Sequence, residues 1–195
     1  MVASPRRLGA PDAKNRTVLI DAAEQLMLEE GYAAVTARRV AAKAGLKHQL
    51  VHYYFRAMDD LFLAVFRRRA EQGLERQAQA LASGQPLRAL WQHSTDTRDT
   101  TLVMEFMGLA NTREAIRSEI ARYAERSRVA QAETLARLFA EGRLTSDACS
   151  PEVLTVLLTS VSRVMIMEQA LGMTVGHAET AAFVERWLRR LEGGP

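Results

Sequence analysis

Residues 36–55, TARRVAAKAGLKHQLVHYYF, decide the fold of this chain. Thr36 is a favourable residue at the N-terminus of a helix, and Val40 and Ala44 follow it on one helical face. Gly45 then stands where a helix ends and the backbone needs a positive φ angle. The pattern predicts a short helix that stops at this glycine.

A second short helix is predicted at residues 48–54, directly after the glycine-containing turn. Two helices joined in this way cross at about 120° in a helix-turn-helix unit. Because residues three or four apart share a helix face, the second helix has two distinct sides. Its apolar side carries Val51 and Phe55, with Leu50 and Tyr54 beside them.

The other side of this helix carries hydrogen-bonding and aromatic groups, namely His48, Gln49, His52 and Tyr53. Such side chains suit the edges of bases and the phosphates of DNA. The alternative interpretation is an ordinary exposed polar surface, since helix-turn-helix geometry also occurs in proteins that do not bind DNA. The segment is therefore a candidate for reading DNA.

Charge is distributed unevenly along the chain. Residues 1–70 hold 12 Lys and Arg against 7 Asp and Glu, a net charge of +5, and the remaining residues hold 14 against 16, a net charge of −2. The basic part contains the predicted helix-turn-helix. A moderate positive charge there favours the neutralisation of phosphates, although a surplus of this size is also compatible with a solvated surface.

Residues 16–66 resemble the N-terminal DNA-binding domain of the TetR family of bacterial transcriptional regulators. The resemblance covers about a quarter of the chain. The remaining three quarters are outside it, in a region that differs between members of this family. The features that carry the resemblance are ordered and spaced as in the family: the pair Ala22-Ala23, Gly31-Tyr32, Thr36, Ala41, Ala44-Gly45-Leu46 and the triplet Tyr53-Tyr54-Phe55.

The resemblance implies roles for individual residues in binding DNA. The positions expected to approach base edges in the major groove are His48, Gln49 and His52, with Arg38 in some members. The positions expected to contact the DNA backbone are Thr36, Lys47, Tyr53 and Tyr54.

Two further cations are assigned to the phosphates. Arg39 lies beside Arg38 in the first turn of a helix, where the helix dipole disfavours positive charge, and nearby DNA would explain both residues. Met58 replaces a lysine that is common in the family, and Arg56 is the possible substitute. Two other departures from the family pattern, Lys47 and Gln49, are expected to change which bases are read.

The chain is predicted to be all-α, with about nine helices. We expect a flexible arm at residues 1–11, whose Arg6 and Arg7 can reach DNA, a three-helix helix-turn-helix domain at 12–66, and a ligand-binding and dimerisation bundle at 67–195. Arg67, Arg68 and Arg69 are interpreted as a solvated surface. The other helices are expected near residues 14–30, 58–82, 87–93, 99–111, 112–141, 151–171 and 177–191, between glycine and proline breaks.

Catalytic, metal and membrane functions find little support in the sequence. Cys149 is the only cysteine, and neither a zinc-binding HExxH motif nor a recognisable nucleophile turn is present. We therefore predict no enzyme activity, cofactor or metal; a helical-bundle enzyme with an acid/base pair near Glu105 is the alternative. No apolar run is judged to reach the roughly 18 to 20 residues needed to cross a bilayer, so the predicted location is the cytoplasm.

Two of the predicted helices, residues 100–111 and 153–172, are apolar nearly all round and are expected to be buried on most sides. The second helix has more apolar surface than a small bundle can bury, so a partner subunit is the simplest cover for it. The resemblance also implies that the last two helices form a four-helix dimer interface. Its expected residues are Val161, Met165, Phe183, Val184, Trp187, Leu188 and Leu191.

A cluster of methionines in this region fits either core packing or a pocket for a flexible apolar ligand. Two carboxylates in apolar runs, Glu105 and Glu168, are interpreted mainly as members of ion pairs with Arg163 or Arg113, and alternatively as anchors for a ligand. The candidate pocket residues are Trp91, Met104, Glu105, Phe106, Met107, Met165 and Glu168.

The sequence is thus interpreted as a dimeric regulator, a repressor that leaves a near-palindromic operator when a small apolar effector binds. One alternative is a DNA-binding regulator that has no effector or that activates transcription. An alternative of a different class is a helical adaptor that binds other proteins.

Overall fold

The computed structural model describes residues 10–95, 97–145 and 149–193, and the side chains of 14–95, 101–145 and 149–193. Within these ranges all regular structure is helical, with nine α-helices and one short 3₁₀ helix and without a β-strand. The prediction of an all-α protein is therefore confirmed. Arg6 and Arg7, the cations of the predicted arm, lie outside the described residues.

The helix boundaries follow the sequence breaks closely. The first helix begins at Ala10 rather than near Lys14, so Pro11 lies in its first turn, where a missing N–H is tolerated. The elements are α1 (Ala10–Glu30), η1 (Tyr32–Ala34), α2 (Ala37–Lys43), α3 (His48–Tyr54), α4 (Met58–Leu81), α5 (Pro86–Ser94), α6 (Thr97–Ala110), α7 (Glu114–Ala140), α8 (Pro151–Ala170) and α9 (His177–Leu191).

The chain divides into two compact units. The first contains the described residues as far as Arg69 together with Leu102–Glu119, and the second contains those of Ala70–Thr101 and of the chain from Ile120 onward. Helices α4, α6 and α7 each contribute residues to both units. The functional division at residues 66 and 67 remains a prediction.

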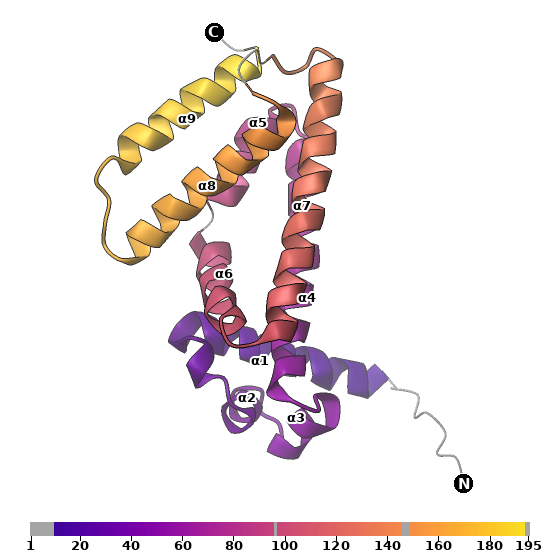
Figure 1. Cartoon of the computed structure of the whole chain (residues 1–195). Helices are drawn as coiled ribbons and strands as arrows, with labels where there is room; N and C mark the ends of the chain where they lie inside the picture. Colours follow the sequence, from indigo (N-terminus) through magenta and orange to yellow (C-terminus); the bar gives the residue numbers. More distant parts are fainter. Residues whose placement is uncertain (1–9, 96, 146–148, 194–195) are drawn as a thin grey trace. The chain divides into compact units, whose positions relative to one another are not determined.

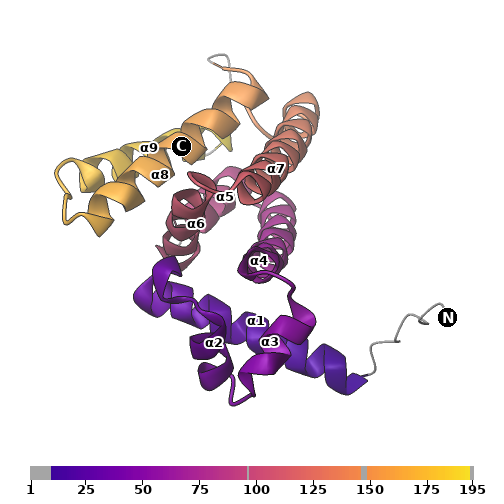
Figure 2. The same cartoon turned by 60° about the horizontal axis from the view of Figure 1, so that its bottom comes forward.

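The first unit is built around the three N-terminal helices (Figure 2), with α2 packed against both α1 and α3. One apolar side chain from each of α1, α2, α3 and α4 is at most 1% exposed: Leu19, Val40, Val51 and Leu61. Each such burial stabilises the fold by about 1.5–3 kcal/mol. The rings of Phe66 and Phe106 meet edge to face, with their centroids 5.1 Å apart.

The link between α1 and α2 depends on a carboxylate from α6. Gly31 adopts a φ of 80°, and the backbone N–H of Tyr32 donates a hydrogen bond to Glu105 Oε2 at 2.6 Å. Glu105 therefore accepts a hydrogen bond at the start of η1, which is a different partner from the expected arginine. Arg113, one of the two arginines proposed for it, forms an ion pair with Asp59.

The core of the second unit joins residues of α4, α5, α7, α8 and α9. The N-terminus of α5 is held by Glu192, whose Oε1 accepts a hydrogen bond from Leu87 N at 2.8 Å. Helices α8 and α9 lie side by side (Figure 1), and both contact α5. The buried cluster consists of Leu81, Leu87, Leu90, Trp91, Leu135, Leu138, Leu144, Leu154, Leu158, Val184, Leu188 and Leu191.

Helix α8 corrects the expectation about apolar runs. Its 20 residues have an 18-residue window of mean hydropathy 1.3, so by length and composition alone it is long enough to cross a membrane. This is weak evidence for a membrane segment, because core helices share the same composition. Leu154 and Leu158 of α8 are part of the core of the second unit.

The close approach of α6 to η1 gives a stability prediction. Alanine normally stabilises a helix interior relative to glycine by about 0.5–1 kcal/mol. At Gly108, however, a new Cβ would lie 2.9 Å from Tyr32 Cε1. We expect Gly108→Ala to lower the free energy of unfolding by about 1 kcal/mol in the natural chain, because of this overpacking, and to raise it in a Tyr32→Ala background.

Urea unfolding of the four proteins of this double-mutant cycle would measure the coupling. Equal stabilisation by Gly108→Ala in both backgrounds would show that the Tyr32 ring does not press on α6.

Candidate nucleic-acid interface

Helices α2 and α3 are joined by a turn whose geometry follows from its residues. Thr36 Oγ1 accepts a hydrogen bond from the N–H of Arg39 at 3.3 Å, as predicted for an N-cap. Gly45 has a φ of 65°, which favours glycine, and Leu46 N donates to Ala41 O at 2.9 Å. These bonds end α2 and direct the chain into α3.

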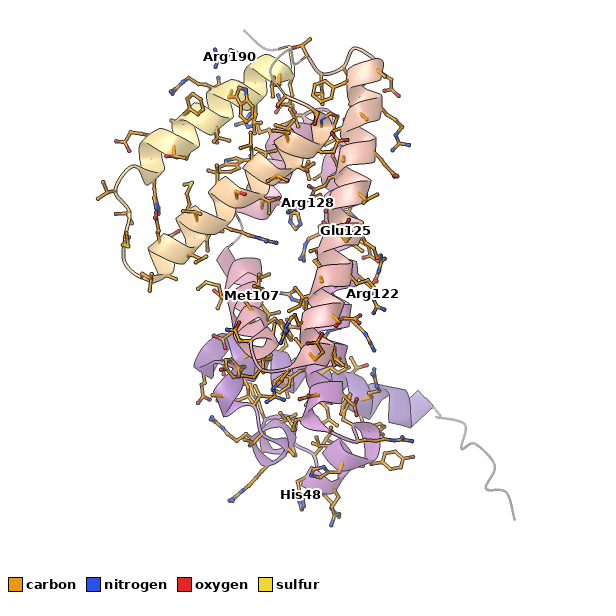
Figure 3. The ribbon with its side chains drawn as sticks, in the orientation of Figure 1. His48, Met107, Arg122, Glu125, Arg128 and Arg190 are labelled. Atoms are coloured by element: carbon orange, nitrogen blue, oxygen red, sulfur yellow. The ribbon has the colours of Figure 1, made fainter. Side chains whose placement is uncertain are left out.

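The two predicted sides of α3 are confirmed by burial. Val51 and Phe55 are 1% and 3% exposed, so the apolar side is fixed in the core of the first unit. On the opposite side His48, whose side chain points away from α1 (Figure 3), is exposed. Gln49 and His52 are exposed as well.

The residues assigned to phosphate contacts surround this exposed face. Thr36, Lys47 and Arg56 are exposed, and so is Arg38, which is assigned to base edges. Tyr53 is 50% exposed, and its ring meets that of the half-buried Tyr54 edge to face at 4.9 Å.

Arg39 has an intramolecular partner that the sequence did not indicate. Its Nη2 lies 2.5 Å from Glu30 Oε1, and the neighbouring Lys43 Nζ lies 2.6 Å from Glu29 Oε2. The hydrogen bond from Arg39 lowers the pKa of the Glu30 carboxyl group. These pairs connect α2 to the end of α1, and the Glu30 carboxylate offsets part of the positive charge that Arg39 would offer to a phosphate. Arg38 has no such ion pair among the described residues.

Arg67 is exposed, as expected for a solvated surface, whereas Arg68 and Arg69 are half-buried and form ion pairs, so that interpretation is wrong for these two residues. Burial lowers the pKa of Arg68, but its hydrogen bonds to Glu24 and Asp21 outweigh this effect and raise the pKa. These arginines hold α4 against α1 and α7 within the first unit. The ion pairs are Arg67 with Glu119 at 2.9 Å, Arg68 with Asp21 and with Glu24 at 2.6 Å, and Arg69 with Glu24 at 3.4 Å.

The candidate pocket residues are divided between the two units. In the first unit, Phe106 is 2% exposed, whereas Met104 and Met107 are 36% and 52% exposed. The expectation that this helix is buried on most sides is therefore wrong for the chain by itself.

In the second unit, Trp91 belongs to the buried core and Met165 packs against it. Glu168 has an unexpected partner, since its Oε2 lies 2.8 Å from His177 Nε2. A groove of about 570 Å³ in this unit is lined instead by α4, α7 and the residues after α7.

The expected dimer residues also have different environments. Val184, Leu188 and Leu191 are in the core of the second unit, and Val161, Met165 and Trp187 are partly buried against it. Phe183 is 56% exposed. Helix α8 also has exposed apolar residues at helical spacing, none of which was among the expected dimer residues: Val153, Val156, Leu157, Val164 and Met167.

Within the described residues, no group of three or more His, Cys, Asp or Glu side chains is arranged to hold a metal ion. The exposed face of α3, with the cations near it, is thus the best candidate for a functional site. Its guanidinium, imidazole and amide groups can pair with the edges of DNA bases.

Comparison with known proteins agrees with this geometry. Residues 19–65 match the model of the bacterial regulatory proteins of the tetR family. The matched segment contains α2, the turn and α3. No curated protein is significantly similar in sequence.

Solved structures share the fold over nearly the whole chain. The reduced form of Escherichia coli NemR has a TM-score of 0.76 at 17% identity, with 93% of this chain and 99% of that chain covered. A TetR transcription regulator from Haloarcula marismortui has a TM-score of 0.74 at 20% identity, with coverages of 92% and 98%.

A third similar structure is a transcriptional regulator from Saccharomonospora viridis in complex with choline. Its TM-score is 0.71 at 19% identity, with coverages of 91% and 95%. The family match to the helix-turn-helix segment and the shared helical fold confirm the sequence-based identification. Residues 19–65 thus match the tetR family of bacterial regulatory proteins, and the chain shares the helical fold of TetR transcriptional regulators over nearly its whole length.

Proposed function

We propose that the protein is a cytoplasmic homodimeric repressor that reads a near-palindromic operator with α3 and leaves it when a small, largely apolar effector binds to residues 67–195. The observation that carries the DNA-binding part is the exposure of His48, Gln49 and His52 opposite the buried Val51. A helix anchored on one side and polar on the other can enter a major groove without unfolding.

Sequence reading is assigned to His48, Gln49 and His52, with Arg38 beside them. Gln pairs in bidentate fashion with adenine and Arg with guanine, each worth about 1–3 kcal/mol of discrimination between bases. Lys47, at the start of α3, and the nearby Thr36, Tyr53, Tyr54 and Arg56 provide the phosphate contacts that fix the register of the helix.

The dimer is supported by the exposed apolar face of α8 and by Phe183 of α9. Exposed apolar residues gathered along one helix are typical of a protein interface. A two-fold axis through this face would give two reading helices, which can address half-sites about 34–36 Å apart.

The effector is supported by the fold comparison, because the Saccharomonospora viridis regulator is in complex with choline. An effector can release the operator only through a difference in affinity between the DNA-bound and the released conformations. The candidate pocket residues lie in both units, and the groove of about 570 Å³ makes the second unit the proposed place of the effector.

Selection of binding sites from a random duplex library at near-physiological salt tests the proposed function. We expect a two-fold symmetric consensus. Binding without a consensus that vanishes as salt rises would indicate only non-specific attraction to phosphates and would contradict sequence reading.

Substitutions on α3 should separate reading from anchoring. We expect Gln49→Ala and His52→Ala to relax the preference for bases at single operator positions, because they remove hydrogen bonds to base edges. Lys47→Ala should weaken binding to all sequences and reduce the slope of log affinity against log salt by about one, since it removes one phosphate contact.

Fluorescence anisotropy with the selected site and single-base variants at several salt concentrations would measure both effects. Equal loss on every sequence for all three variants would rule out this division of roles.

An acidic residue on the apolar face of α8 should break the dimer. Val164 is 51% exposed on α8, and Val129, on α7, is 46% exposed and serves as the matched control. Sedimentation velocity of Val164→Glu should show one chain of 21.7 kDa, whereas Val129→Glu should stay dimeric. Dissociation of both variants, or of neither, would place the interface elsewhere.

A further inference from the structure

In the second unit, a groove lies between helices α4 and α7, and none of the roles described above involves it. Helices α4 and α7 run alongside each other (Figure 1), and Gln77 of α4 bonds to the carbonyl oxygen of Ser127 at 3.0 Å. The groove between them has a volume of about 570 Å³. This lies within the range of small-molecule sites, about 300–1,000 Å³.

The groove is elongated and has an apolar floor. Leu81 and Leu138 belong to the buried core of the unit, and Leu74 extends the floor along α4. From Leu74 to Ala82 the groove follows α4 for about 12 Å at a rise of 1.5 Å per residue. The small side chains of Ala78 and Ala130, both exposed, leave space above the floor.

A fixed polar network forms the wall of the groove. Gln77 is 4% exposed, and its Oε1 accepts hydrogen bonds from Ser127 Oγ at 2.6 Å and from Gln131 Nε2 at 2.8 Å. Because the amide of this glutamine is satisfied on both sides, it holds α4 and α7 at a defined spacing. The groove is therefore part of the folded unit rather than a chance gap between side chains.

Charge is concentrated at one end of the groove. Arg137 and Arg143 line it together with a single carboxylate, that of Glu141, which lies 4.0 Å from Arg143. Arg137 donates only to Thr134 Oγ1, at 3.2 Å, and has no carboxylate partner among the described residues. At the other end Arg126 is paired with Glu71 at 3.1 Å.

We propose that this groove binds a carboxylate that has an unbranched apolar chain. The chain would lie along Leu74, Ala78 and Leu81, and the carboxylate group would lie at Arg137 and Arg143. A guanidinium pairs with a carboxylate through charge-assisted hydrogen bonds, and an extended chain matches the shape of the floor. The inference deepens the proposed effector function by naming a ligand class, and it rests on that function for its regulatory meaning.

The probe is laurate, a linear twelve-carbon carboxylate (n-dodecanoate), kept below its micelle concentration. Isothermal titration calorimetry without DNA measures its affinity for the full chain. We expect saturable binding of laurate and none of the dodecyltrimethylammonium cation, which has the same chain and the opposite charge. The absence of laurate binding, or equal binding of the cation, would overturn the proposal.

Two variants and their matched controls locate the site. Arg137→Gln should weaken laurate binding about three- to tenfold, because it removes an exposed charge partner. Arg128→Gln is its control, since Arg128 lies on α7 (Figure 3) and does not line the groove. Ala130→Leu should fill the groove and abolish binding, whereas Ala136→Leu, also exposed on α7 but outside the groove, should not.

Both alanines are exposed, so neither substitution disturbs the core, and circular dichroism would verify the fold. Unchanged affinity in Arg137→Gln and Ala130→Leu would show that laurate binds elsewhere and would reject the site. Because this assay contains no DNA, such a result would not bear on operator binding. The site-selection experiment tests that part of the proposed function separately.

Discussion

The proposed DNA-binding surface depends on the burial of a few apolar side chains beneath two very short helices. Helices α2 and α3 have seven residues each. Isolated helices of this length are unstable in water because nucleation fixes several residues for each hydrogen bond gained. Val40 and Val51, at most 1% exposed, provide the missing stability. The exposed face of α3 is therefore a consequence of the core on its other side.

Ion pairs within the first unit shape the electrostatic field that DNA would meet. Several cations of this basic region are held by carboxylates of α1, among them Arg39, Lys43 and Arg68. An exposed pair such as that of Arg39 with Glu30 contributes little to stability, but all of these pairs fix the positions of charged groups. Arg38, Lys47 and Arg56 are exposed, and they are the cations proposed to meet DNA beside α3.

Within the second unit, the apolar residues of α8 and α9 have two separate tasks. Leu154, Leu158 and Leu188 fill the core together with α5. Val156, Val164 and Phe183 remain exposed. This distribution explains why α8 is apolar on nearly every side, a composition that also resembles a membrane segment. The proposed dimer would cover the exposed face, and the groove between α4 and α7 would remain open for a ligand.

The sequence by itself determined the helical fold, the turn at Gly45 and the two faces of α3, because these depend on local spacing, capping and a positive φ angle. Only the tertiary structure decided which residues form hydrogen bonds and ion pairs with one another. Glu105 accepts from Tyr32, 73 residues away, and Arg68 pairs with Glu24, 44 residues away. It also divided the expected interface of α9 into buried Leu188 and exposed Phe183. Such choices depend on which elements meet in space, and local patterns hold no information about that meeting.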